Sequence, residues 1–229
     1  GAVGSGTRLG ALTITSARHV GGNNADPPGA DAVITAASIE QTGGTGTSRF
    51  GALNTDAVAG IDLNGDVITL NGGVTTTGAG PVTITNGGQL TIAAAGDMSL
   101  DGAFEQDGAG LVSTAGDITT TDDDILFSTN GTPPAVTLTG AVSLDSGAGV
   151  GDISFGGTVD GGNDLTVAAG TGDVVFVDAV GGTTRLGALT ITSARHVGGD
   201  NTDPPGADAV ITAASIEQTG GTGTSRFGA

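Results

Sequence analysis

The residues of this chain that could do chemistry are mostly carboxylates. Asp and Glu number 24 against six Arg, while Lys, Cys, Trp and Tyr are absent. Without Cys there is no disulfide, thiolate zinc site or thiol nucleophile, so hard oxygen ligands leave calcium as the metal to consider. The candidate calcium ligands are Asp62 and Asp66 in "DLNGD" and the run Asp122, Asp123 and Asp124, with Asp160, Asn163 and Asp164 as a third cluster.

These acidic segments do not complete a calcium loop. Val67 stands where a helix-loop-helix calcium site needs Gly, and no Glu follows at the twelfth position. "GGNDLT" resembles a calcium-binding nonapeptide but is never repeated in tandem. Ordinary Asp-rich turns are therefore the alternative to calcium sites, and no other cofactor is expected.

Paired carboxylates could also cleave glycosidic bonds. The Lys or Tyr that usually supports such a pair is missing, and the only His residues, His19 and His196, occupy equivalent positions in a repeat beside Arg18 and Arg195. We expect each Arg-His pair to face solvent or to contact a neighbouring Glu such as Glu40. The prediction is that the protein is not an enzyme and has no catalytic residues.

An internal repeat dominates the chain. Residues 1–52 align without gaps with residues 178–229 at an offset of 177, and 47 of the 52 positions are identical. The chain is thus one continuous segment in which residues 7–183 form one full 177-residue repeat and residues 184–229 begin the next. This organisation favours a segment of a tandem array over a single duplication.

A shorter signature, Gly-Asp followed by an apolar residue, recurs five times inside the repeat. Two of its spacings are close to the length of one β-solenoid coil, and we interpret the two longer ones as coils with an inserted loop. About seven or eight coils per repeat would advance the chain roughly 35 Å. We expect the signatures to turn the chain into a strand; they are Gly65/Asp66, Gly96/Asp97, Gly116/Asp117, Gly151/Asp152 and Gly172/Asp173.

The elements that position these residues are short strands. Alternating runs such as "ALTIT", "PVTIT" and "DVVFV" are separated by Gly, Asn and Asp, which tolerate positive φ at corners. The prediction is an all-β, right-handed parallel β-helix with coils of about 20–30 residues. An array of β-sandwiches is the rival, disfavoured because no Trp or Tyr is available for their cores. Interior positions at the wider coils are assigned to Phe104, Phe127, Phe155 and Phe176.

Segments such as "GDVVFVDAVGGTTRLGALTITSA" and "LTIAAAGDMSLDGAFEQDGAG" resemble the β-strand repeats of filamentous haemagglutinin-type exoproteins, large bacterial surface proteins related in architecture to autotransporter passenger domains. The resemblance covers essentially the whole chain. It implies a right-handed β-helix at the cell surface or outside the cell.

Charge is unevenly distributed along the chain. Residues 51–184 contain 17 Asp and Glu and no basic residue, whereas residues 1–50 are neutral. This acidity argues against nucleic-acid partners, and no apolar run is long enough to insert into a membrane. One interpretation is a solvated acidic surface; another is that Arg segments contact the acidic segments of a neighbouring copy. The candidate assembly contacts are Arg8, Arg18, Arg49, Arg185, Arg195 and Arg226.

Together these features predict a structural segment of an extracellular fibre or adhesin stalk that associates with copies of itself. The alternative is an adhesin module that binds cell-surface glycans or a surface protein through the Pro-Pro loops that begin at Gly21, Gly198 and Ser128. A sequon at Asn130 could accept sugar. Thr-x-Thr pairs such as Thr13/Thr15 are too widely spaced for an ice-binding face.

Overall fold

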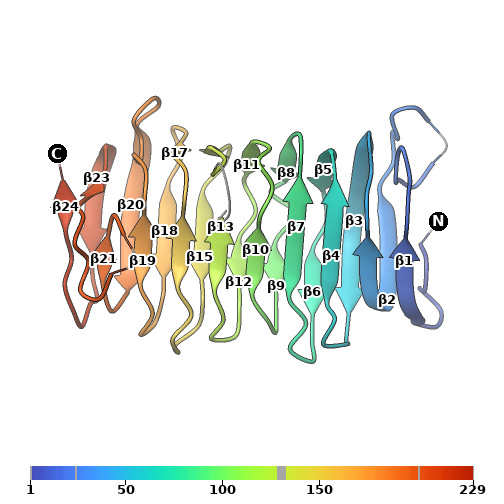
Figure 1. Ribbon diagram of the computed structural model, residues 1–229, viewed down its shortest axis with the longest axis horizontal. Coiled ribbons are helices and arrows are strands. Elements are labelled where there is room, and N and C mark those ends of the chain that lie inside the picture. The colour runs from blue at the N-terminus through green and yellow to red at the C-terminus, as the bar shows by residue number, and fades with distance from the viewer. Residues whose placement is uncertain (1, 24, 128–132, 201, 229) are drawn as a thin grey trace.

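The protein is a parallel β-solenoid of about nine coils. The computed structural model describes residues 2–23, 25–127, 133–200 and 202–228, and its regular structure is entirely β-strand. Each strand pairs in parallel with the strand one coil later, so the coils lie side by side and the two termini lie at opposite ends of the long axis (Figure 1). This topology excludes the β-sandwich alternative, whose sheets are antiparallel.

The strands form three axial stacks, named first, second and third in the order in which each coil visits them. The first stack holds β1 (Leu9–Ile14), the second half of β2 (Ala32–Gln41), β4 (Ile61–Gly65), β7 (Val82–Asn86), β10 (Phe104–Gln106), β13 (Ile125–Phe127), β16 (Ile153–Phe155), β19 (Val174–Phe176) and β21 (Val197–Gly198).

The second and third stacks share the long strand β3 (Thr47–Thr55). Its first half belongs to the second stack, with β5 (Val67–Leu70), β8 (Leu90–Ile92), β11 (Val112–Thr114), β14 (Val136–Leu138) and β17 (Val159–Asp160). Its second half belongs to the third stack, with β6 (Val74–Thr76), β9 (Met98–Ser99), β12 (Ile118–Thr119), β15 (Val142–Asp145), β18 (Leu165–Ala168), β20 (Leu186–Ser193) and β23 (Ala213–Gln218). The short pair β22 (Ala209–Val210) and β24 (Phe227–Gly228) lies at the C-terminal end.

Alternate residues of each strand point into the tube, and the inward ones are mostly small or branched apolar side chains. The prediction that four Phe fill the interior is confirmed. The rings of Phe127, Phe155 and Phe176 occupy matching register positions and stack nearly parallel, with centroids 5.0 and 5.4 Å apart. Phe104 lies two register positions away from this column, and its ring is accordingly tilted by 55° against Phe127.

The structure places all five Gly-Asp pairs at corners that lead into a strand. The expectation that corner glycines serve to adopt positive φ is wrong for these five, because none of them has it. Their role is to allow close approach between coils: a Cβ on Gly96 would lie 2.7 Å from the Leu70 carbonyl oxygen, and one on Gly151 would lie 2.5 Å from that of Asp123. At Gly96, Gly116, Gly151 and Gly172 a side chain would meet the backbone of the preceding coil and push the coils apart, whereas at Gly65 it would meet only the side chains of Gln41 and Ile68.

The interpretation of the longer signature spacings is also wrong. Gly65 precedes a strand of the second stack, Gly96 and Gly116 precede strands of the third, and Gly151 and Gly172 precede strands of the first. The short spacings, from Gly96 to Gly116 and from Gly151 to Gly172, are therefore single coils. Each longer spacing moves the signature on by one coil and one further corner, and is not a single coil with a loop.

The 177-residue repeat is not a whole number of coils. Leu12 pairs with Ile39 in the first stack, but their copies Leu189 and Ile216 pair in the third stack. Between Ile39 and Val197, which share the first stack, the chain makes seven coils, and Ile216 lies two stacks further on. One repeat is thus seven and two-thirds coils, so each repeated feature moves to a neighbouring face of the tube.

Candidate functional site at the repeat junction

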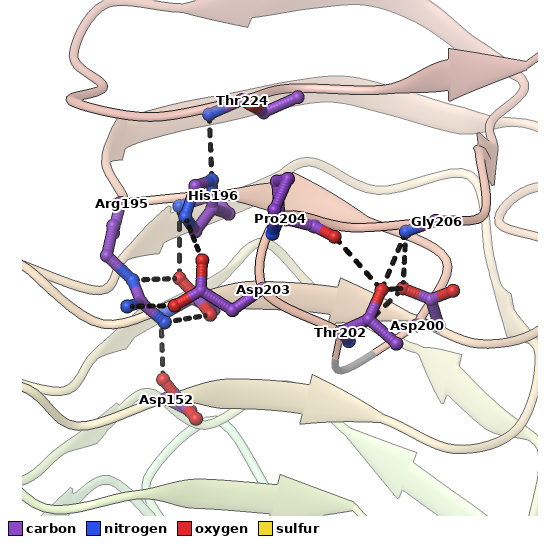
Figure 2. A network of polar contacts seen from close by, with 10 residues as sticks. Asp152, Arg195, His196, Asp200, Thr202, Asp203, Pro204, Gly206 and Thr224 are labelled. Carbon is purple, nitrogen blue, oxygen red and sulfur yellow. Dashed lines mark hydrogen bonds and ion pairs between the residues drawn. The ribbon is translucent and has the colours of Figure 1, made fainter.

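A dense polar cluster lies where the first repeat meets the second copy. We call Asp173, Arg195, His196, Asp203 and Thr224 the junction cluster; Figure 2 labels the last four of these residues. Arg195 donates from Nε to Asp173 Oδ1 at 2.9 Å and from Nη2 to Asp173 Oδ2 at 2.7 Å, and its Nη1 reaches Asp203 Oδ2 at 2.8 Å. The two-pronged contact with Asp173 joins the last coil of one repeat to the first coils of the next.

His196 connects three segments of this cluster. Its Nδ1 accepts the backbone N–H of Thr224, one coil later, at 2.7 Å, and its Nε2 lies 3.0 Å from Asp203 Oδ1. Because Nδ1 accepts a backbone donor, the neutral ring carries its proton on Nε2 and donates it to Asp203. The imidazole is nearly buried, with 10% of the side chain exposed. The expected contact with Glu40 is therefore wrong, because each pair contacts the Asp that follows it in the next loop. The expectation that the pairs face solvent holds for the two arginine side chains, which are 61% and 42% exposed, and is wrong for the two imidazoles.

The electrostatics of the cluster favour an ionised Asp173. Burial alone would raise the pKa of this carboxyl, but the hydrogen bonds and the charge of Arg195 outweigh it, and the pKa of Asp173 is lowered. The hydrogen bond with Asp173 in turn raises the pKa of the Arg195 guanidinium. Asp152, one coil earlier, has a raised pKa because it is partly buried and lies near Asp173 and Asp124. Asp124, Asp152 and Asp173 thus form a column of acidic side chains on successive coils, and Arg195 binds the last of them.

That column has a structural role that the sequence did not suggest. The carboxylate of Asp152 accepts the backbone N–H of Asp173 at 2.7 Å, and the carboxylate of Asp173 accepts that of His196 at 3.1 Å. Such bonds satisfy backbone donors at corners where the strand ladder is interrupted. The same contact to the next coil is made by Asp97 to Asp117, Asp117 to Ser143, Asp122 to Gly149, Asp124 to Asp152, Asp160 to Thr183 and Thr184, and Asp164 to Ala188.

The first copy repeats only part of the cluster. Arg18 pairs with Asp26, His19 Nε2 lies 2.8 Å from Asp26 Oδ1, and His19 Nδ1 accepts the Thr47 N–H at 2.8 Å. The carboxylate that Asp173 gives to Arg195 has no counterpart at Arg18 among the described residues. The contact of His with Asp and with the next coil, which we call the His clip, is thus internal to each copy, while the Arg195–Asp173 bond belongs to the contact between repeats.

The other arginines named as assembly contacts are mostly occupied within the chain. Arg8 forms an ion pair with Asp56 at 3.0 Å, and the remaining pairs are Arg49–Asp31 at 3.1 Å and Arg226–Asp208 at 2.8 Å. Arg185, the copy of Arg8, is exposed and forms no hydrogen bond or ion pair with another described residue. Five of the six arginines in the described part of the chain are therefore paired within this molecule.

The proposed calcium ligands are not brought together as a coordination site. Asp62 lies in β4 beside Glu40 of the neighbouring coil, and burial together with Glu40 raises its pKa, whereas Asp66 lies at the following corner. Asp122 and Asp124 accept backbone N–H groups; burial and its acidic neighbours raise the pKa of Asp123. Over the described ranges, no group of three or more Asp, Glu or His is arranged to hold a metal ion. Asp122 and Asp124 thus act as hydrogen-bond acceptors at corners, as in the Asp-rich turns that were the alternative, and calcium binding by these residues stays a prediction.

The fold and the junction geometry therefore show a chain whose charged residues fasten coil to coil. No family model, curated protein or solved structure matches this chain. What the structure establishes is a β-solenoid of about nine coils. In the parts of the chain that the structure describes, no helix is long and apolar enough to cross a membrane. The sequon at Asn130 and the start of the loop at Ser128 lie outside the described residues.

Sequence reasoning missed Asp203 and Thr224 as partners of His196, and Asp26 and Thr47 as their copies. One signal was available for the carboxylates: both copies contain an Arg-His pair followed at the same spacing by an Asp-Pro-Pro segment. No signal was available for Thr224, because its backbone N–H, not its side chain, makes the contact.

Proposed function

We propose that this protein is a structural repeat segment of an extracellular or cell-surface stalk, which spans distance by axial stacking of coils and has no enzymatic activity. The observation that carries the proposal is the continuity of the stack across the repeat junction. The ladder from β18 passes to β20, that from β19 passes to β21, and Asp173 is bonded to Arg195 across the same boundary. A second repeat unit thus prolongs the tube without an interruption.

The resemblance to filamentous haemagglutinin-type exoproteins supports the cell-surface location and the right-handed sense of the coil, which are parts of this proposal. The composition is in keeping with an exposed stalk, since a net charge of −18 keeps a long β-protein soluble. Lateral assembly through the arginines receives less support than end-to-end continuity. Most of them are already paired, and a face of the tube recurs only after three repeats.

The test is the length of chains that carry one, two and three 177-residue repeats, measured by small-angle X-ray scattering and electron microscopy. Seven and two-thirds coils at the spacing of parallel strands predict an increase of about 37 Å in the long dimension for each repeat, at constant width. An increase in width, or a length that does not grow linearly, would contradict the stalk. Antibodies against the chain are expected to label intact, unpermeabilised cells that produce it.

The second candidate is a module that binds cell-surface glycans or a surface protein through its repeated loops. One observation favours it: the loop after His196 is held in shape by its own contacts, with Asp200 Oδ1 accepting the Gly206 N–H at 2.9 Å and Asp203 tied to Arg195 and His196 (Figure 2). The displacement between repeats would carry this loop to successive faces of the tube. Because a face of the tube recurs only after three repeats, binding to one surface through such loops is expected to strengthen when three repeats are added, and not with each single repeat.

A further inference from the structure

Besides Arg18 and Arg195, the two copies of the repeated sequence differ in the contacts of the arginine that precedes β1 and β20. Arg8 is bound on several sides: Nε lies 3.0 Å from Asp56 Oδ2, Nη1 donates to the Ala36 carbonyl at 2.7 Å and to the Asn54 carbonyl at 3.0 Å, and Nη2 contacts the Asn54 side chain. Arg185 has the same sequence after it and is exposed. The partners Asn54 and Asp56 belong to a segment whose copy would follow residue 229.

The apolar surface of the C-terminal coil differs in the same way. Ile39 is covered by Ile61 and is 1% exposed, whereas its copy Ile216 is 46% exposed. Phe50 is covered by Leu70 and is fully buried, whereas its copy Phe227 is 41% exposed. The C-terminal coil of this structure therefore presents an uncovered sheet edge and apolar side chains, and the first copy shows which residues cover their equivalents.

Backbone groups and charge agree with the same cover. In the first copy the Ile39 N–H donates to the Gly60 carbonyl at 3.1 Å, and the Asn71 N–H donates to the Phe50 carbonyl at 2.7 Å. The C-terminal face carries the exposed Arg185 together with Glu217 and the Arg226–Asp208 ion pair, and residues 53–71 contain Asp56, the carboxylate that binds the equivalent Arg8 in the first copy. A coil of this sequence thus supplies the hydrogen bonds, the apolar cover and the one carboxylate that Arg185 lacks.

We propose that the C-terminal face, formed by Arg185 and the coil 209–228, is a docking surface for a coil with the sequence of residues 53–71 carried in series by a further repeat unit. This proposal rests on the proposed function, and it specifies the register and the anchor of the contact. Arg185 binds the carboxylate equivalent to Asp56, and the Ile216 N–H binds the carbonyl equivalent to that of Gly60. A second copy of the whole chain cannot dock these residues unchanged, because its own residues 1–52 already cover them.

The experiment lengthens the whole chain by adding a copy of residues 53–105 after Ala229. Hydrogen exchange at the Ile216 amide is expected to slow by about tenfold or more in the lengthened chain, because that N–H acquires an acceptor. Arg185→Ala is expected to leave the unfolding of the original chain unchanged and to destabilise the lengthened one, as Arg8→Ala does in the original. Arg226→Ala is the matched control: its bond to Asp208 exists in both chains, so its effect is expected to be equal in both.

Two results would overturn the inference. One is an unprotected Ile216 amide in the lengthened chain. The other is an Arg185→Ala effect that is the same in both chains, or that persists when the Asp56 copy is replaced by Ala. If either result is found in a chain that still lengthens along its axis, the proposed docking register is rejected and the proposed stalk function is not affected. Failure of the chain to lengthen would instead reject the stalk.

Discussion

Nearly the same sequence occurs twice in this structure, as residues 1–52 and 178–229, and the two copies are buried in opposite ways. In the first copy Leu9 is 38% exposed and Phe50 is fully buried; in the second, Leu186 is 1% exposed and Phe227 is 41% exposed. Because a solenoid coil contacts only its two neighbours, each copy lacks the neighbour that the other has. Superimposing the two gives the environment of these residues inside a longer tube, where both faces are covered.

The largest effect that this comparison predicts concerns the two equivalent phenylalanines. Phe50→Ala is expected to cost about 3–5 kcal/mol, since it leaves a cavity between stacked coils. Phe227→Ala is expected to cost about 1 kcal/mol or less, because much of that ring is already in water. Urea unfolding followed by circular dichroism measures the first loss, and hydrogen exchange of the last coil measures the second, which can fray on its own.

The reversed pair is the control for that prediction. Leu186→Ala is expected to be more destabilising than Leu9→Ala, because here the second copy is the covered one. If Phe50→Ala cost as much as Phe227→Ala, and Leu9→Ala as much as Leu186→Ala, the two copies would have equally covered neighbours in solution. The interpretation that each copy lacks a neighbouring coil on one side would then be wrong.

A second, smaller effect separates the junction from the acidic middle of the chain on acidification. The pKa of Asp173 is lowered in the folded state, so its contribution to stability is complete above the ordinary Asp value near pH 4 and is lost as the pH falls through the lowered value. Burial raises the pKa values of Asp62 and Asp123, so their coils gain stability as the pH falls. The measurement is amide hydrogen exchange at pH 7 and pH 3, corrected for the intrinsic pH dependence of the exchange rate. At pH 3 we expect the amides of Arg195–Val197 to open more often than at pH 7, and those around Asp62 to open less often.

Asp173→Asn provides the control for the junction. Its side-chain oxygen can still accept the His196 N–H, but the charge that binds Arg195 is gone. Opening of the junction in this variant is expected to be more frequent at pH 7 and to lose most of its pH dependence. An unchanged profile would mean that Asp173 is not the group whose protonation opens the junction.

The sequence could predict those features that depend on residues close together in the chain, and it could not predict those that depend on contacts between coils. Alternating small apolar residues and Gly-Asp corners are local, and they predicted the solenoid and the interior position of Phe127, Phe155 and Phe176. The right-handed sense stays a prediction. The displacement by one face per repeat could not be predicted, because it depends on coil lengths that vary along the chain, as the register pairs Phe104–Ile125 and Ile125–Ile153 show.

The junction was missed for a related reason. Its bonds join residues of different coils, such as Asp173 and Arg195, and no spacing rule connects them until the register is known. The abundance of Asp was interpreted as Asp-rich turns, as a source of solubility or as calcium ligands. Its use as an acceptor for the next coil requires only that a carboxylate lie at a corner beneath an unpaired N–H, which composition alone does not show.

The smallest difference between the copies is expected at Gly46 and Gly223, which lie against the two imidazoles. A Cβ added to Gly46 would come within 2.5 Å of His19 Cε1, and one added to Gly223 would approach His196 about as closely, so Gly46→Ala and Gly223→Ala should each displace a ring. Because all partners of the His clip lie within each copy, we expect equal local losses of about 1–3 kcal/mol, measured by hydrogen exchange at Thr47 and Thr224.

Unlike the two glycines beside the imidazoles, the equivalent glycines Gly10 and Gly187 are expected to respond differently to substitution. A Cβ on Gly10 meets no atom within 4 Å, whereas one on Gly187 would collide with Asp164 Oδ1 from the preceding repeat. Gly10→Ala should therefore be neutral and Gly187→Ala destabilising. Equal effects at the clip glycines and unequal effects at this pair would together show that the His clip is a property of each copy and that the Asp contacts are a property of the join between repeats. The opposite pattern would mean that the join does not form in solution.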